Sequence, residues 1–143
     1  MIGLALCNKG IEEIVSLDIK EILRKKSIKG RGHVTFQFEK EDELCKLAYI
    51  SQSISKVILV LDSFEFKSQK KIIEQAGKLQ LKWFNKDRKF KVDAKVIESD
   101  IEQEEIRGEI GEAIINSLTD YEQKVDLSNP DITIYIYINR NKA

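Results

Sequence analysis

The sequence of 143 residues predicts an α+β fold in two domains, residues 1–64 and residues 65–143. Short runs of β-branched and aromatic residues alternate with stretches in which apolar residues recur every three or four positions. That alternation is typical of strands interspersed with amphipathic helices. The pattern begins afresh after a tight boundary near residues 62–67, without a flexible linker. We therefore expect the two domains to pack against each other.

The first domain is expected to follow the order strand–helix–strand–helix–strand, as in a ferredoxin-like split βαβ unit. Its first helix carries Ile11, Val15, Ile19 and Ile22 on one face, between an acidic start and a basic end that suit the helix dipole. Asp42 is the expected cap of the second helix. The expected strands are Ile2–Cys7, a short one near Ser27–Gly30, His33–Glu39, and Lys56–Leu61, which is covered on both faces and extended by Phe64–Phe66.

The second domain is expected to begin with a helix capped by Ser68. A row of lysines runs beside its apolar face, where lysine stems can lie along the apolar edge. The strand Phe90–Val96 follows, and Ser99-x-x-Glu102 is a capping box that opens the next helix. The lysines are Lys71, Lys78 and Lys82, and the two apolar faces are Ile72, Ala76, Leu79 and Trp83, and Ile106, Ile110, Ala113, Ile114 and Leu118.

The stretch Val125–Ile138 contains the most clearly patterned strand. Four isoleucines at alternate positions from 132 to 138 are separated by a threonine and two tyrosines, so one face of the strand is expected to lie on a core. Pro130, the only proline, precedes it. Because proline lacks a backbone N–H, it fits the entrance or edge of this strand and not its centre.

The charge is unevenly distributed although the formal net charge is zero. Residues 1–61 hold ten basic and eight acidic residues, a net +2. Residues 62–95 hold ten and five, a net +5, and residues 96–143 hold four and eleven, a net −7. A basic middle segment of this kind fits a polyanion partner, and solvated helix faces are the commoner explanation of such a pattern.

Cysteine usage and hydropathy predict a cytoplasmic protein with no membrane partner. Cys7 and Cys45 lie far apart, and His33 is the only histidine, so the usual zinc spacings are absent. Two inert, buried thiols fit a reducing compartment. The apolar N-terminus is short and lacks a basic lead-in, which indicates a strand and not a signal peptide. The longest apolar run, Val57–Leu61, is too short to cross a bilayer.

No group of residues predicts a catalytic or metal site. His33 has no positioned partners, which favours a surface or loop histidine over a catalytic base. Gly30-Arg31-Gly32 lacks a spaced third glycine and leads into a strand, so it is not a phosphate loop. The acidic cluster 100–105 lies at an expected helix start, where the dipole favours negative charge, so capping is favoured over metal binding.

Two features leave alternatives open. Gly108 and Gly111 lie inside a helix, where each costs about 1 kcal/mol relative to alanine, so we expect a close approach of the backbone to a packed strand or, less often, to a ligand phosphate. Tyr135 and Tyr137 are suited to stacking on unpaired bases, although cross-strand pairing or cover by a helix is the commoner role.

The remaining chemistry is cationic. Basic residues come from a helix end, a loop, an adjoining strand and a neighbouring helix, and we expect them to converge into one patch for a sugar–phosphate strand. Such contacts give salt-dependent affinity with little sequence preference. The predicted RNA-binding residues are Lys82, Arg88, Lys89, Lys91, Lys95 and Arg107.

Several motifs resemble those of THUMP-containing RNA guanosine N2-methyltransferases, in matching order and over nearly the whole chain. The first is a strand ending in a small polar turn and a Gly-hydrophobic-Glu helix start. The others resemble their ferredoxin-like N-terminal domain and then the THUMP domain itself. The matching segments are 7–14 (CNKGIEEI), 32–36 (GHVTF) with 44–61, Trp83-Phe84, Phe90-Lys91-Val92, 111–114 (GEAI) and 125–132 (VDLSNPDI).

The resemblance implies a ferredoxin-like domain packed on an α/β THUMP domain, a unit that grips the acceptor 3′ end of tRNA. Catalysis in that family belongs to a C-terminal domain that binds S-adenosylmethionine and carries an Asp/Asn-Pro-Pro-Tyr/Phe tetrapeptide. This chain has neither, and residues 129–131 (NPD) are not that tetrapeptide, so we expect no cofactor in the chain itself. Two departures, Val96 where an arginine is frequent and Ser128 where a lysine is, remove potential phosphate contacts.

The favoured hypothesis is an RNA-binding region, for tRNA ahead of ribosomal RNA, that positions substrate for a guanosine N2-methyltransferase. It is either the N-terminal part of a larger enzyme or a stand-alone THUMP protein. The alternative is a non-catalytic protein–protein adaptor of an RNA-modifying enzyme, which the neutral net charge and the acidic last third favour. A stand-alone enzyme ranks last.

Overall fold

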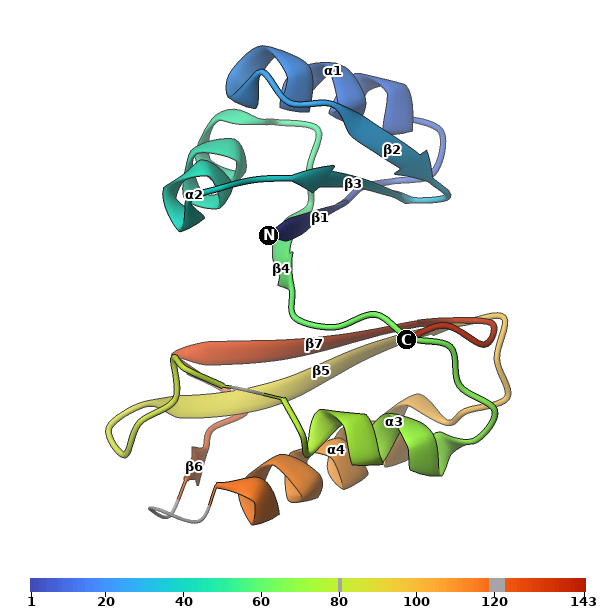
Figure 1. Cartoon of the computed structure of the whole chain (residues 1–143), viewed down its shortest axis with the longest axis vertical. Coiled ribbons are helices and arrows are strands. Elements are labelled where there is room, and N and C mark those ends of the chain that lie inside the picture. Colours follow the sequence, from blue (N-terminus) through green and yellow to red (C-terminus); the bar gives the residue numbers. More distant parts are fainter. Residues whose placement is uncertain (80, 119–122) are drawn as a thin grey trace. The chain divides into compact units, whose positions relative to one another are not determined.

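The computed structural model describes residues 1–79, 81–118 and 123–143. The chain forms two compact units, Met1–Leu61 and Asp62–Ala143 (Figure 1). Each unit combines helices with a sheet, which confirms the predicted mixed α and β fold. Residues 62–64 fall in the second unit, and the domain boundary between residues 64 and 65 stays a prediction.

The first unit has the order β-α-β-β-α-β around a four-stranded antiparallel sheet. The strand order is β2-β3-β1-β4, the split βαβ arrangement in which two helices return across one face of the sheet. Its elements are β1 (Ile2–Leu6), α1 (Glu12–Leu23), β2 (Ser27–Gly30), β3 (His33–Gln37), α2 (Glu41–Ile50) and β4 (Lys56–Val60).

The core of the first unit lies between its two helices and one face of its sheet (Figure 1). Helical periodicity places Val15 and Ile19 of α1 and Leu47 of α2 on the sheet, where all three are fully buried. The period of two along β3 places Val34 and Phe36 beneath them. Of the apolar positions predicted for α1, Val15, Ile19 and Ile22 contribute to this core, whereas Ile11 is the cap residue and does not.

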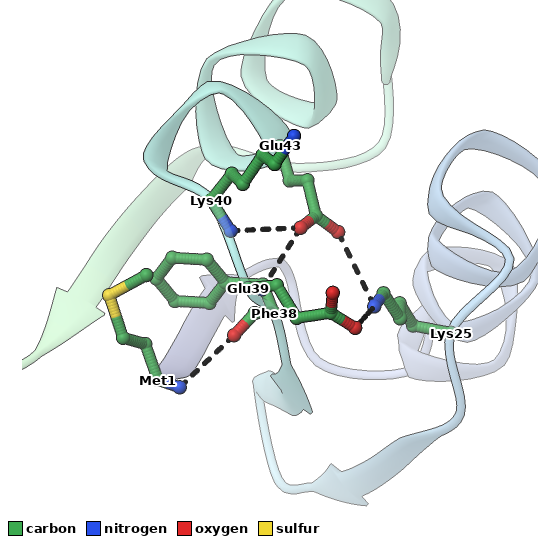
Figure 2. Close-up of polar contacts among 6 residues, drawn as sticks. All are labelled: Met1, Lys25, Phe38, Glu39, Lys40 and Glu43. Carbon is green, nitrogen blue, oxygen red and sulfur yellow. Dashed lines mark hydrogen bonds and ion pairs between the residues drawn. The ribbon is translucent and has the colours of Figure 1, made fainter.

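Polar contacts join the start of α2 to the segment that follows α1 (Figure 2). Glu43 Oε1 accepts hydrogen bonds from the backbone N–H groups of Glu39, at 2.9 Å, and Lys40, at 3.0 Å. Lys25 Nζ lies 2.8 Å from Glu39 Oε1 and 3.7 Å from Glu43 Oε2. These donors, the Glu39 N–H first, lower the pKa of Glu43. The contacts fix the entry of the chain into α2.

The carboxylate of Glu12 ties two turns of the first unit together. Its Oε2 accepts from the N–H of Gly10 at 2.9 Å, and its Oε1 accepts from the N–H of Gly32 at 2.7 Å. Both glycines have positive φ, 98° and 76°, a conformation that other residues rarely adopt. The Gly32 contact is the main reason that the pKa of Glu12 is lowered.

Two predictions for the first unit are wrong. Asp42 does not cap α2, because the cap position is Lys40 and the helix already begins at Glu41. Lys56–Leu61 is not covered on both faces: no residue of β4 is fully buried. Both helices lie on one face of the sheet, so only Val57 and Leu59 of this β-branched run contact the core of the unit.

The second unit is built on a three-stranded parallel sheet with the order β6-β5-β7. Helices α3 and α4 lie on the same face of that sheet (Figure 1). Parallel neighbours need a crossover, which α4 supplies between β5 and the last two strands. The elements are α3 (Gln69–Ala76), β5 (Lys89–Ile97), α4 (Gln103–Ser117), β6 (Lys124–Val125) and β7 (Ile132–Asn139).

The core of the second unit joins the alternate residues of β5 and β7 to the buried face of α4. The register pairs Phe90 with Ile132 and Val92 with Ile134, so these side chains share one face. Ile106, Ile110 and Ile114 of α4 pack on that face with no exposed surface. The predicted strand Phe90–Val96 and the central positions predicted for the last helix are confirmed.

The segment that follows β4 pairs with the far end of the second unit. The Phe64 N–H donates to the Ala143 carbonyl at 2.9 Å, and the Ala143 N–H donates back at 3.0 Å. The Phe66 N–H donates to the Asn141 carbonyl at 2.8 Å. The prediction that Phe64–Phe66 extends β4 is therefore wrong, since these residues pair within the second unit.

Helix α3 ends at Ala76, so the prediction that it continues to Trp83 is wrong. The cap position is Gly77, where an added Cβ would lie 3.5 Å from the Ala113 carbonyl of α4. A Cβ there would make only an ordinary van der Waals contact, and the low helix propensity of glycine fits the end of α3 at this position. Leu79 and the lysines at 78 and 82 consequently lie outside the helix, and the predicted lysine row does not form.

The predicted side-chain caps of the second unit do not form. Ser68 occupies the cap position of α3, but its side chain makes no capping hydrogen bond. Glu102 occupies the cap position of α4, also without such a bond, so Ser99-x-x-Glu102 is not a capping box. Among the described residues, no helix is long and apolar enough to cross a membrane.

Replacing Ile110 with alanine should lower the free energy of unfolding of the second unit by about 2–5 kcal/mol, since this fully buried side chain would leave a cavity. Trp83, the only tryptophan, lies in this unit and reports its unfolding in urea by fluorescence. The control Ile115→Ala, on the same helix at a side chain 37 % exposed, should lose less than about 1 kcal/mol. Equal losses would contradict this packing.

Candidate nucleic-acid interface

Three of the predicted RNA-binding lysines share one face of the second sheet. Along β5, Phe90, Val92 and Ala94 are buried beneath the helices. Successive side chains of a strand point to opposite faces. Lys89, Lys91 and Lys95 therefore lie on the face away from α3 and α4, with Asp93 among them.

The tyrosines of β7 stand beside these lysines. The register pairs Asp93 with Tyr135 and Lys95 with Tyr137, so both tyrosines share the lysine face. Both are half-buried, and burial raises the pKa of each phenol. The negative charge of Asp93 raises the pKa of Tyr135 further. Aromatic side chains of β7 thus lie next to cationic side chains of β5 on this side of the sheet, an arrangement suited to bases and phosphates.

A second group of predicted residues gathers around Trp83, in the loop between α3 and β5. Lys82 Nζ lies 4.5 Å from the centroid of the Trp83 ring, within cation–π range. Arg88 Nη1 donates to the Trp83 carbonyl at 3.1 Å. We call Lys82, Trp83 and Arg88 the tryptophan cluster.

The loop that carries the tryptophan cluster is held at two points. The Phe84 ring is buried and lies 5.1 Å from the Phe90 ring, which anchors the loop to the core. The Asn85 side-chain oxygen accepts from the N–H groups of Asp87, at 3.0 Å, and Arg88, at 3.1 Å. Such an Asx turn presents the neighbouring cations without a helix to carry them.

Lys89 and Arg107, among the six predicted cations, each pair with a carboxylate of the described residues. Lys89 Nζ lies 2.9 Å from Asp126 Oδ2, and that contact is the main cause of the raised pKa of Lys89. Arg107 Nη1 lies 3.0 Å from Glu104 Oε1, one turn away on α4. Since α4 covers the opposite face of the sheet, Arg107 does not join the lysines of β5. The expected single patch of six cations is therefore not formed.

Trp83 is a candidate binding residue that the sequence analysis missed. The apolar spacing of Ile72, Ala76 and Leu79 led to its assignment to the buried face of a helix. Its position in the segment 82–89, KWFNKDRK, was the available signal, because basic residues around an aromatic one are typical of nucleic-acid contacts.

The other sequence features do not assemble into a reactive centre. In the described parts of the chain, no three His, Cys, Asp or Glu side chains gather as a metal ion would require. His33 lies at the start of β3, with its Nδ1 3.3 Å from the Arg31 carbonyl. The backbone of Gly108 approaches no strand: a Cβ there would meet nothing within 4 Å. At Gly111 a Cβ would only touch Val92, at 3.8 Å.

The comparisons with known proteins identify the second unit. A family model described as the THUMP domain matches residues 66–143, and no curated protein sequence matches the chain. Similar folds occur in a possible methylase from Clostridium difficile 630 (TM-score 0.85, 19% identity), in TrmN from Thermus thermophilus (0.73, 15%), and in a 4-thiouridine synthetase solved with RNA and ATP (0.62, 18%).

Each of these likenesses covers 99% of this chain. The chain in turn spans 39% of the methylase, 43% of TrmN and 39% of the thiouridine synthetase. At these identities the structural likeness establishes the fold alone. It covers both units, and the match to the THUMP family model covers the second unit. In each of these three larger proteins, the region that shares the fold of this chain makes up less than half of the length.

Replacing Lys89 with methionine should raise the pKa of Asp126 from about 2 while leaving it below 3.8. The reason is that the N–H of Asn129, the largest cause of the lowering, and that of Ser128 would still donate to the carboxylate. Because the folded pKa is depressed, the stability from Asp126 is complete above 3.8 and is lost as the pH falls through about 2. A carboxyl titration by NMR measures this pKa.

The matched control is Lys95→Met, which removes a lysine from the same strand and face and should leave the Asp126 pKa unchanged. An unchanged pKa in Lys89→Met would show that the ion pair does not form in solution.

Proposed function

The chain belongs to the THUMP domain family, and from this membership we propose that it binds RNA, tRNA ahead of ribosomal RNA, and positions it for a guanosine N2-methyltransferase. The tryptophan cluster is the observation that carries the proposal. An indole flanked by an ammonium and a guanidinium group offers an unpaired base a stacking surface and offers the adjoining phosphates two cations.

The lysine face of β5 supports a continuation of this contact. Lys91 and Lys95 lie on β5, which pairs with β7 along its length, so their Cα positions are fixed by the sheet. Lysine contacts to phosphates supply affinity and orientation without reading sequence. The substrate would therefore be recognised chiefly by its single-stranded character and its shape, as is usual for RNA.

Bond formation is proposed to occur outside this chain. The chain spans about two fifths of the methylase-like proteins that share its fold, and it lacks an Asp/Asn-Pro-Pro-Tyr/Phe tetrapeptide. A catalytic domain or partner that binds S-adenosylmethionine would act on the RNA held here. Binding of S-adenosylmethionine to this chain alone, measured by calorimetry, would contradict the proposal that a separate domain or partner binds it.

Replacing Trp83 with leucine should weaken binding of tRNA with an intact single-stranded 3′ end by roughly 5- to 150-fold, the range expected for loss of one stacked base. A gel-shift titration measures the affinity, and tRNA trimmed of its 3′ end should bind the unaltered chain weakly. The control Tyr49→Leu removes a 92 % exposed aromatic ring from the first unit and should change nothing. Equal affinity of the Trp83 variant and the unaltered chain for tRNA would contradict the assignment of the tryptophan cluster as an RNA-binding site.

A plot of log affinity against log salt concentration has a negative slope. The double variant Lys91→Gln, Lys95→Gln should make that slope less negative by about 1.4, the value for two contacts to single-stranded phosphates. The control Lys26→Gln, Lys46→Gln removes two exposed lysines from the first unit and should leave the slope unchanged. The triple variant Lys82→Glu, Lys91→Glu, Lys95→Glu should abolish binding while the protein stays folded, as checked by circular dichroism. An unaltered slope in the first variant would exclude the lysine face.

A further inference from the structure

A surface groove runs along α4 in the second unit, on the side of the sheet away from the β5 lysines. Its volume is about 430 Å³, large enough for several side chains of a partner. Gly108, Gly111 and Ile115 line it from α4, and Val125 and Leu127 line it from β6 and the loop that follows. Buried Phe90 and Val92 of β5 form its floor.

Glycine keeps the groove open. The space where a Gly108 side chain would begin is empty to beyond 4 Å, and at Gly111 only Val92 is near. A glycine inside a helix costs about 1 kcal/mol relative to alanine, and at Gly108 no packing within the described structure explains that cost. The helix backbone is thus exposed to whatever enters the groove.

The opposite wall presents apolar side chains that are held in place. Leu127 is 64 % exposed and Val125 is 50 % exposed, and on the α4 side Ile115 is 37 % exposed. Asp126 stands between Val125 and Leu127 and holds the loop in place. Its Oδ1 accepts hydrogen bonds from the N–H groups of Ser128, at 3.0 Å, and Asn129, at 2.9 Å. A leucine held outward on an ordered loop costs a partner little ordering entropy, as a preformed binding surface should.

The rim of the groove is acidic. Glu104 and Glu112 line it, and Arg107, the one cation among its described lining residues, pairs with Glu104 at 3.0 Å. Helix α4 as a whole has four glutamates and one arginine. Because these glutamates outnumber the arginine, their net negative charge repels phosphates and attracts ammonium and guanidinium groups. The charge therefore favours a cationic, apolar protein segment over RNA.

We propose that this groove binds a segment of a partner protein in which branched apolar side chains are flanked by lysine or arginine. The apolar side chains would lie over Gly108 and Gly111 and against Leu127, and the flanking cations would meet Glu104 and Glu112. This site lies on the face of the sheet opposite to the β5 lysines, and it does not depend on the proposed binding of RNA. A chain with both sites would hold a protein on one face of its second sheet and RNA on the other.

The test uses the complete chain, labelled with ¹⁵N, and a synthetic peptide with the sequence acetyl-KLLKKLLK-amide. The peptide should shift the amide resonances of Gly108, Gly111, Val125 and Leu127. Its counterpart acetyl-ELLEELLE-amide should bind at least about tenfold more weakly, because the rim repels it. Equal binding of the two peptides, or shifts spread over both units, would overturn the proposal.

Two variants localise the contact. Gly108→Leu would fill the groove from a position with open space, and Leu127→Ser would remove an exposed side chain, so both should fold. Each should weaken binding of the lysine peptide by about tenfold or more, whereas Tyr49→Ser, in the first unit, should not. Unchanged affinity in both groove variants would overturn the proposal. A single-stranded oligouridylate that shifts the groove resonances more than the lysine peptide does would assign the groove to RNA instead, and would also overturn it.

Discussion

The burial of alternate β5 residues beneath α4 is the constraint on which the second unit depends. Phe90, Val92 and Ala94 face the fully buried isoleucines of the helix. Because a strand has a period of two, this burial leaves no choice for the remaining residues, and Lys89, Lys91 and Lys95 must lie on the other face. A single packing requirement thus separates a cationic face of the sheet from the acidic groove beside α4. Each proposed binding surface is a consequence of the same core.

Much of the fold could be predicted because its elements carry strong periodicity. The positions Val15 and Ile19 in α1, Ile106, Ile110 and Ile114 in α4, and the alternation in β5 and β7 all form the cores as expected. The boundaries were less predictable, because local signals competed with tertiary ones. Helix α3 ends at Ala76 although the apolar spacing continues past it, and the start of α2 depends on a carboxylate three residues into the helix. This second contact is local, because Glu43 stands three residues after Lys40, and the choice of Asp42 as the cap overlooked it.

The candidate site was predicted in part, for a related reason. Alternation along the predicted strand Phe90–Val96 places Lys91 and Lys95 on one face, since it is a local property, and Lys89 joins them because β5 begins one residue earlier. Lys89 and Asp126 pair although they are 37 positions apart in the sequence, and no periodicity in the sequence predicts this pairing. Trp83 was misplaced because its spacing from Ile72 and Ala76 continued a helical pattern beyond the true end of the helix. The two glycines of α4 predicted a close approach of the backbone to a strand or a phosphate, whereas the space beside Gly108 is empty.

The antiparallel pairing of residues 64–66 with residues 141–143 has a mechanical consequence. It places the entrance and the exit of the second unit side by side, joined by three backbone hydrogen bonds. Tension between these two ends would break the three hydrogen bonds sequentially before any force acted on the hydrogen bonds between β5 and β7. A module fused after Ala143 would therefore be tethered close to Phe64, and it could swing about that point while the sheet stayed intact.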